Sequence, residues 1–184
     1  MHLLKGSTTR LYEAKRANFE EAVLPHLDAA YNLARWLTRN EADADDVVQE
    51  AFLRAFRFYE GFHGLNCRAW LLTIVRNTCY TWLQANRAGE PTTSFDEEIH
   101  STETQSASPD AALLANADRE MLQQAMEELP LEFREVLVLR ELEGVTYKEI
   151  AEIAGIPMGT VMSRLARARG RLQQSLARRL GKES

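Results

Sequence analysis

Apolar side chains recur at helical spacing along nearly the whole chain. Residues 19–38 predict an amphipathic helix with Pro25 in or near its first turn, because its apolar stripe contains Val23, Leu27, Tyr31 and Ala34. Helices are also predicted over residues 42–59, 68–87 and 111–128, with a break at Pro130 and a further helix up to Leu142. We find no clean strand alternation, so the predicted fold class is all-α.

Residues 146–172 predict two short helices joined by a tight turn. Gly155 can adopt the left-handed conformation that ends the first helix, and Pro157 suits the opening of the second. The second helix is predicted over 160–172. Its apolar stripe, which we expect to be buried, is formed by Val161, Leu165, Ala168 and Leu172. Its opposite side carries Thr160, Ser163, Arg164, Arg167 and Arg171. This pattern is typical of a helix that reads the major groove, where arginine pairs with guanine. An ordinary basic surface helix is the alternative.

Between these helical parts, residues 88–109 combine Gly, Pro, Ser and Thr with scattered acids and show little periodicity, which predicts a linker. The predicted organisation is an N-terminal arm (1–18), a helical domain (19–88), an acidic flexible linker (89–110) and a second helical domain (111–184). The second domain contains the helix-turn-helix. Arg10, Lys15 and Arg16 make the arm basic, and we assign it no role.

Charge is distributed unevenly along the chain. The formal net charge is -5, yet every charged residue from 157 to 182 is basic and every one from 88 to 118 is acidic. Charges farther apart than roughly 10 Å are screened at moderate salt, so the local basic patch governs contact with DNA. The acidic total argues against strong non-specific DNA binding, and indicates that a partner supplies most of the affinity.

Composition excludes several classes of function. Cys67 and Cys79 lack CxxC spacing and are expected to be reduced thiols, and the four histidines are scattered. With no Gly-rich phosphate loop, Cys/His pairing or HExxH helix, we expect no catalytic residue, cofactor or metal site. The longest apolar run, residues 69–75, is too short to span a bilayer, and no signal peptide is evident. A soluble, cytoplasmic protein is expected.

Two helices of the first domain carry unusual polar faces. The helix at 43–57 presents acids and amides opposite an apolar face; taken alone, this pattern favours a solvated helix with acids near its N-terminus. The helix at 68–87 interleaves Trp70, Tyr80 and Trp82 with basic and amide groups, a pattern that suits single-stranded nucleic acid. Packing in a core is the alternative for these rings, above all for Trp70.

Taken together, these segments resemble a bacterial RNA polymerase sigma factor of the extracytoplasmic-function (ECF) class. The resemblance rests on Asp-Asp-Val-Val-Gln-Glu-Ala-Phe-Leu-Arg-Ala-Phe-Arg at 45–57 and Arg-Ala-Trp-Leu-Leu-Thr-Ile-Val-Arg-Asn-Thr-Cys-Tyr at 68–80. It also rests on Glu-Leu-Pro at 128–130 and on Gly-Thr-Val-Met-Ser-Arg-Leu-Ala-Arg-Ala-Arg at 159–169. These motifs occur in the family's order and cover residues 19–176.

The resemblance implies a role for each helical face. The first domain would dock on core RNA polymerase, at the clamp of the β′ subunit, through Asp45, Asp46, Gln49, Glu50, Leu53 and Arg54. It would open the promoter -10 element and capture a flipped base with Phe62, Arg76, Asn77, Tyr80 and Arg87; Phe62 matches only if a one-residue gap is allowed. The second domain would read the duplex -35 element through Thr160, Met162, Ser163, Arg164 and Arg167.

The chain departs from the family's pattern at Met162, where many members carry an arginine. Methionine cannot contact phosphate or read guanine, so a different -35 preference, or reliance on DNA shape, is expected. The acidic linker would thread a basic polymerase channel, or serve only as a disordered tether.

The resemblance also implies an anti-sigma factor, often membrane-bound, that would hold the protein inactive at the inner membrane. The partners expected are thus core RNA polymerase, including its β subunit, promoter DNA and an anti-sigma factor, with no small-molecule substrate. The alternative is a self-sufficient helix-turn-helix regulator with a helical sensing domain, which would bind its duplex site without polymerase.

Overall fold

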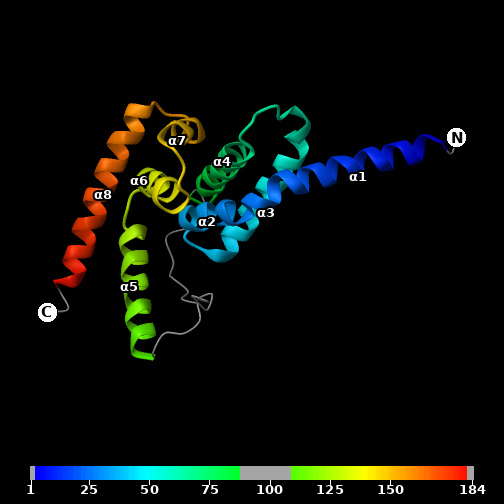
Figure 1. Ribbon diagram of the computed structural model, residues 1–184. Coiled ribbons are helices and arrows are strands. Elements are labelled where there is room, and N and C mark those ends of the chain that lie inside the picture. Colours follow the sequence, from blue (N-terminus) through cyan, green and yellow to red (C-terminus); the bar gives the residue numbers. More distant parts are fainter. Residues whose placement is uncertain (1–2, 88–108, 182–184) are drawn as a thin grey trace.

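The computed structural model describes the backbone of residues 3–87 and 109–181 and the side chains of residues 13–86 and 117–181. The predicted linker, apart from its last two residues, lies outside these ranges. Described elements in chain order are α1 (Leu3–Val23), η1 (Leu24–His26), α2 (Leu27–Thr38), α3 (Glu41–Phe58), η2 (Tyr59–Gly61), α4 (Cys67–Arg87), α5 (Pro109–Glu127), α6 (Leu131–Leu137), η3 (Val138–Leu142), α7 (Tyr147–Ala154) and α8 (Met158–Leu180). The described residues contain helices and no strand, which confirms the all-α fold class (Figure 1).

The first helical unit is built from α2, α3 and α4, which pack against one another. Its fully buried side chains include Leu33, Leu37, Val47, Leu71 and Val75. Helix α3 begins at an N-cap, where the Asn40 side chain accepts a hydrogen bond from the backbone N–H of Asp43 at 3.0 Å. Its buried residues, Ala44, Val47, Val48, Ala51 and Ala55, lie on one face, so the opposite face is left to solvent.

The segment 19–38 is not one helix, because η1 divides it. Helix α1 ends at Val23 and α2 begins at Leu27, with Pro25 near the start of the intervening 3-10 turn. Proline lacks a backbone N–H and cannot continue the α-helical hydrogen bonding of the preceding turn. Upstream, the predicted N-terminal arm is helical from Leu3, and α1 projects away from the other helices (Figure 1). It is anchored by the Phe19 ring, which makes edge-to-face contacts with Phe56 and Tyr59 at 5.2 and 5.3 Å.

The second helical unit contains α5 to α8. Helices α6 and α7 pack against α8 over a core that includes Leu139, Ile150 and Ile153. Arg134 is buried, and its guanidinium donates to the backbone carbonyl of Glu127 at 3.1 Å. This bond satisfies a carbonyl at the end of α5, where Pro130 stops the helix. The short π-helical stretch η3, which the pattern did not predict, continues α6 before the left-handed Gly144 turns the chain toward α7.

Helix α7 and the turn that follows it form as the motif predicts. Thr146 and Glu149 make a capping box at the start of α7, Gly155 ends the helix with φ of 66°, and Pro157 is the N-cap of α8. Val161, Leu165 and Ala168 are buried and Leu172 is half-buried. Helix α8 extends to Leu180, eight residues beyond the predicted end. This extension packs on α5, where Ser175 and Arg179 hydrogen-bond Glu128.

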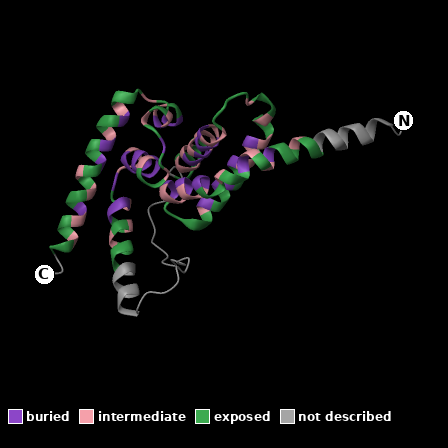
Figure 2. Ribbon diagram, viewed as in Figure 1, coloured by how far each residue is buried: buried purple, intermediate pink, exposed green. Residues whose placement is uncertain are grey.

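The two helical units pack against each other. Helix α4 contacts α7, and α2 contacts α6, so the buried side chains of both units join in one cluster. Figure 2 shows this burial at the centre of the molecule, while one side of α8 and of α3 remains exposed. No helix among the described residues is long and apolar enough to cross a membrane.

Candidate nucleic-acid and protein interfaces

The exposed face of α3 offers acids, an amide and one large apolar side chain. Asp45, Asp46, Gln49 and Glu50 are all exposed. Leu53, one further turn along, is 58% exposed. Arg54 donates to Glu50 at 2.7 Å, an ion pair within the helix surface. An exposed leucine beside carboxylates is not needed for folding, and it suits docking onto a partner with apolar and basic groups.

An aromatic stack lies at the start of α4. The rings of Phe62 and Trp70 stack with 4.7 Å between their centroids and an interplanar angle of 28°. Asn77 follows Trp70 by seven residues, so the two share a face of α4. The Asn77 side chain is exposed, and its amide oxygen accepts a hydrogen bond from Arg76 at 3.2 Å. A ring stack beside an exposed amide can stack and hydrogen-bond an unpaired base.

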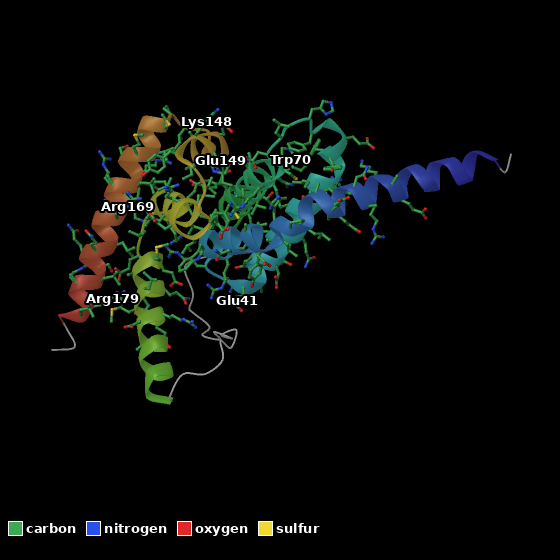
Figure 3. All side chains as sticks on the ribbon, viewed as in Figure 1. Glu41, Trp70, Lys148, Glu149, Arg169 and Arg179 are labelled. Atoms are coloured by element: carbon green, nitrogen blue, oxygen red, sulfur yellow. The ribbon has the colours of Figure 1, made fainter. Side chains whose placement is uncertain are left out.

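The outer face of α8 carries basic residues and small side chains. Ser163 and Arg167 are exposed, Met162 is 48% exposed, and Thr160 and Arg164 are half-buried. Arg164 lines a cleft of about 480 Å³ together with Arg76, Tyr80, Leu131 and Ile156. Figure 3 labels Arg169 and Arg179 along the same helix. Arg169 pairs with Glu141 at 2.6 Å and Arg179 with Glu128 at 2.5 Å, so these two guanidinium groups are engaged by the protein itself.

Comparisons with known proteins match both helical units. The family model for sigma-70 region 2 matches residues 22–89, and that for sigma-70 region 4 matches residues 119–172. The ECF RNA polymerase sigma-E factor of Escherichia coli K12 is 37% identical over 134 residues, which cover 69% of this chain and 70% of that protein. The chain belongs to the ECF RNA polymerase sigma factors. This confirms the family predicted from the four motifs.

Other relatives of this sigma factor agree. SigE of Mycolicibacterium smegmatis is 31% identical over 166 residues, 90% of this chain, and this chain spans 64% of its length. Among solved structures, RpoE of Bartonella quintana in complex with the anti-sigma factor NepR superposes with a TM-score of 0.73 at 28% identity, covering 87% of this chain and 97% of that one. CnrH in complex with the cytosolic domain of CnrY gives a TM-score of 0.64 at 26% identity, covering 92% and 94%.

In this sigma factor, Glu135 of α6 joins the region 2 unit to the region 4 unit. Its side chain is 0% exposed. One carboxylate oxygen accepts from Nε of Arg76 at 2.5 Å, and the other accepts from the Tyr80 hydroxyl at 3.0 Å. The Arg76 guanidinium also lies 4.0 Å from the centroid of the Tyr80 ring. Burial and the neighbouring Glu135 carboxylate raise the pKa of the Tyr80 phenol, so Tyr80 stays a neutral donor.

Two further carboxylates of the region 4 unit hold the same interface. Glu143 accepts from Arg68 at 2.9 Å and from Asn32 at 2.5 Å. Glu149, labelled on α7 in Figure 3, accepts from the side chain of Asn66 just before α4. The interface thus pairs basic and amide groups of region 2 with acids of region 4.

The structure therefore divides the predicted -10 residues into two groups. Phe62 belongs to the ring stack, and Asn77 is exposed on the same face of α4 as Trp70. Arg76 and Tyr80 instead hydrogen-bond Glu135. Arg87 is the last residue of α4, and its side chain lies outside the described part of the chain. Within α8, Arg164 faces the cleft between the units, and only Met162, Ser163 and Arg167 are exposed among the predicted -35 residues.

Sequence reasoning did not find the interface acids Glu135, Glu143 and Glu149. Glu135 has a visible signal, because it stands directly before the apolar run Val136 to Leu139, on a helix that is buried from Phe133 onward. The partners of the other two acids lie more than 70 residues earlier in the chain, and periodicity does not indicate such pairs.

The cysteines are free thiols, as predicted. Cys67 is half-buried and Cys79 is buried. Burial raises the pKa of the Cys79 thiol to about 12, so it is protonated and unreactive at neutral pH. The described residues contain no cluster of His, Cys, Asp and Glu that could hold a metal.

Proposed function

We propose that this chain is a transcription initiation factor that binds core RNA polymerase and directs it to promoters with particular -35 and -10 elements. The observation that carries the proposal is the pair of family matches, in order, on two helical units whose exposed faces differ in chemistry. Region 2 offers an acidic face with an exposed leucine, and region 4 offers a helix without acids. These faces suit a protein partner and duplex DNA respectively.

In this proposal α3 is the docking helix for the polymerase clamp. Asp45, Asp46, Gln49 and Glu50 would meet basic groups of the β′ subunit, while Leu53 would fill an apolar depression and Arg54 would orient Glu50. A leucine that is 58% exposed in the free protein would gain burial on docking, and this burial would contribute to the affinity.

For the promoter, Phe62, Asn77, Arg76, Tyr80 and Arg87 would bind the unpaired -10 strand. Stacking on an aromatic side chain is worth about 1–3 kcal/mol per base, which offsets the cost of unstacking without ATP. Thr160, Met162, Ser163, Arg164 and Arg167 would meet the -35 duplex, with the arginines near phosphate or guanine.

The structural relatives, solved as complexes with NepR and CnrY, support an anti-sigma factor as the regulator of this chain. Because a structural relative was solved with the cytosolic domain of its partner, we propose that this chain acts in the cytoplasm, where its activity would be controlled by release from an anti-sigma factor. No catalytic role is assigned to any residue.

Promoter-directed transcription by purified core polymerase, with and without the chain, tests this function. A second arm measures binding of the chain alone to duplex promoter DNA. Transcripts that depend on the chain, with weak binding by the chain alone, are expected. Tight binding to a duplex site by the chain alone, with no transcripts, would instead favour the self-sufficient regulator.

A further inference from the structure

Two methionines stand out on the first turns of α8. Met158 and Met162 are 49% and 48% exposed, and they lie one helical turn apart, so their side chains are neighbours on the surface. Behind them, Val161 and Leu165 already fill the core at 0% and 1% exposure. The methionines are therefore not required to complete the hydrophobic core of the region 4 unit.

This part of α8 is open to a large partner. A side-chain carbon added at Gly159 would meet no atom within 4 Å, and Ser163 and Ala166 beside it are exposed and small. The surface around the methionines is therefore flat, and it allows the helix backbone to approach a groove closely. The first residues of a recognition helix are those that reach the base edges in a helix-turn-helix complex.

Charge identifies duplex DNA as the occupant of this surface. Helix α8 contains no acid, and Arg167, which lies about two turns farther along and on the other side of the exposed face, makes no ion pair among the described contacts. A helix without acids that exposes an arginine on one side and an apolar pair on its first turns fits a polyanion that carries apolar groups. In the major groove the only apolar group on a base edge is the C5 methyl of thymine.

We propose that Met158 and Met162 read thymine methyl groups in the -35 element, and so set the promoter preference of this chain toward A·T pairs at the positions they cover. The proposal rests on the proposed function, since it assigns a base preference to the helix that would read the -35 duplex. Methionine suits this role because its unbranched thioether adapts to an irregular apolar surface.

Replacing thymine by deoxyuracil in the promoter tests the proposal, because this change removes only the methyl group. A promoter is first selected from a randomised library with core polymerase and the wild-type chain. Each thymine of its -35 element, on either strand, is then replaced singly, and competitive binding by the polymerase complex is measured. Loss of one methyl contact is expected to weaken binding about fourfold, the factor that corresponds to roughly 0.8 kcal/mol.

Variants of the chain assign the effect to the methionines. In Met158→Ala or Met162→Ala, the discrimination between thymine and deoxyuracil should disappear at the position that each residue covers, while Met162→Leu should retain it. Leu180→Ala is the matched control: Leu180 is 57% exposed on the same helix, about 27 Å farther along, and its removal should leave the discrimination unchanged.

The outcomes separate this proposal from the proposed function. Three results would overturn the reading of thymine: a -35 element without a preferred A·T pair, no discrimination in the wild type, or discrimination that survives in both alanine variants. The proposed role in transcription initiation would not be affected by these results. Failure of the chain to direct polymerase to any promoter would overturn the proposed function itself.

Discussion

Two glycines of the region 4 unit differ mainly in their backbone conformation. Gly155 has φ of 66°, whereas Gly170 lies inside α8, and at both positions an added Cβ would meet nothing within 4 Å. We expect Gly170→Ala to stabilise the protein by about 1 kcal/mol, since alanine restricts the unfolded chain and favours the helix. Gly155→Ala should destabilise it by about 1 kcal/mol, because the left-handed conformation is strained for any residue with a Cβ.

Thermal unfolding measures both changes, and shifts of about 2–4 °C in opposite directions are expected for a chain of this length. Equal shifts of one sign would contradict the account, because they would show that the added methyl group, rather than the backbone conformation, decides the result.

At the residue scale, the sequence predicts those features that depend only on neighbouring residues in the chain. Gly155 and Pro157 have conformational preferences that act within one turn, and the structure confirms both. Glu135 could not be assigned from local pattern, because its partners Arg76 and Tyr80 come from another helical unit. The predicted DNA and polymerase contacts of individual side chains stay predictions, since they depend on partners outside the chain.

The capping box at the start of α7 depends on a charged carboxylate. Glu149 accepts hydrogen bonds from the hydroxyl of Thr146 at 2.6 Å and from its backbone N–H at 2.9 Å. These bonds, with smaller contributions from Asn66 and Arg68, lower the pKa of the Glu149 carboxyl below its ordinary value of 4.5. A carboxyl with a lowered folded-state pKa stabilises the fold fully above pH 4.5, and this contribution is lost as the pH falls further.

We therefore expect Glu149→Gln, which keeps the capping-box acceptor and loses the charge, to reduce the free energy of unfolding by about 0.5 kcal/mol at pH 7, and the difference from the wild type to shrink below pH 4.5. Chemical denaturation at several pH values checks this. Glu152→Gln, which changes an exposed carboxylate on the same helix, is the control and should show neither effect. A difference that persists unchanged in acid would contradict the role given to the Glu149 charge.

At the element scale, the helical period predicted α3 and α4 closely, because each buries one continuous face. The part of α1 before Phe19 was missed, because its apolar positions are few and show no clear helical period. The end of α8 was placed too early, since the contacts that hold its last turns come from α5 and leave no periodic signal.

In the whole molecule, one arginine from each of the two proposed promoter-binding surfaces lines the same cleft. Arg76 of α4 and Arg164 of α8 both line it. The two promoter elements are about 25 base pairs apart, or roughly 85 Å at 3.4 Å per base pair. If the chain binds both elements as proposed, we expect the two helical units to separate on the promoter, because in this arrangement they pack against each other.

Glu135 controls this separation in our account, because it is the buried carboxylate between the units. Glu135→Ala leaves Arg76 and Tyr80 without their shared partner and should weaken docking by about 3 kcal/mol. Small-angle X-ray scattering of the free chain should then show a larger radius of gyration, with helical content unchanged by circular dichroism. Glu132→Ala, on the same helix and without an ion pair among the described contacts, should remain compact. A compact Glu135 variant would contradict this role.

Promoter-directed transcription shows whether this chain acts as an initiation factor and whether α3 docks on the polymerase. Purified core RNA polymerase is combined with the wild-type chain, with Leu53→Asp, or with no addition, on a promoter library. We expect transcripts from a defined set of promoters with the wild type alone, because an acid at position 53 would replace the exposed leucine of α3. If no transcript depends on the chain, or if Leu53→Asp is as active as the wild type, then either the proposed function or the proposed docking face is wrong.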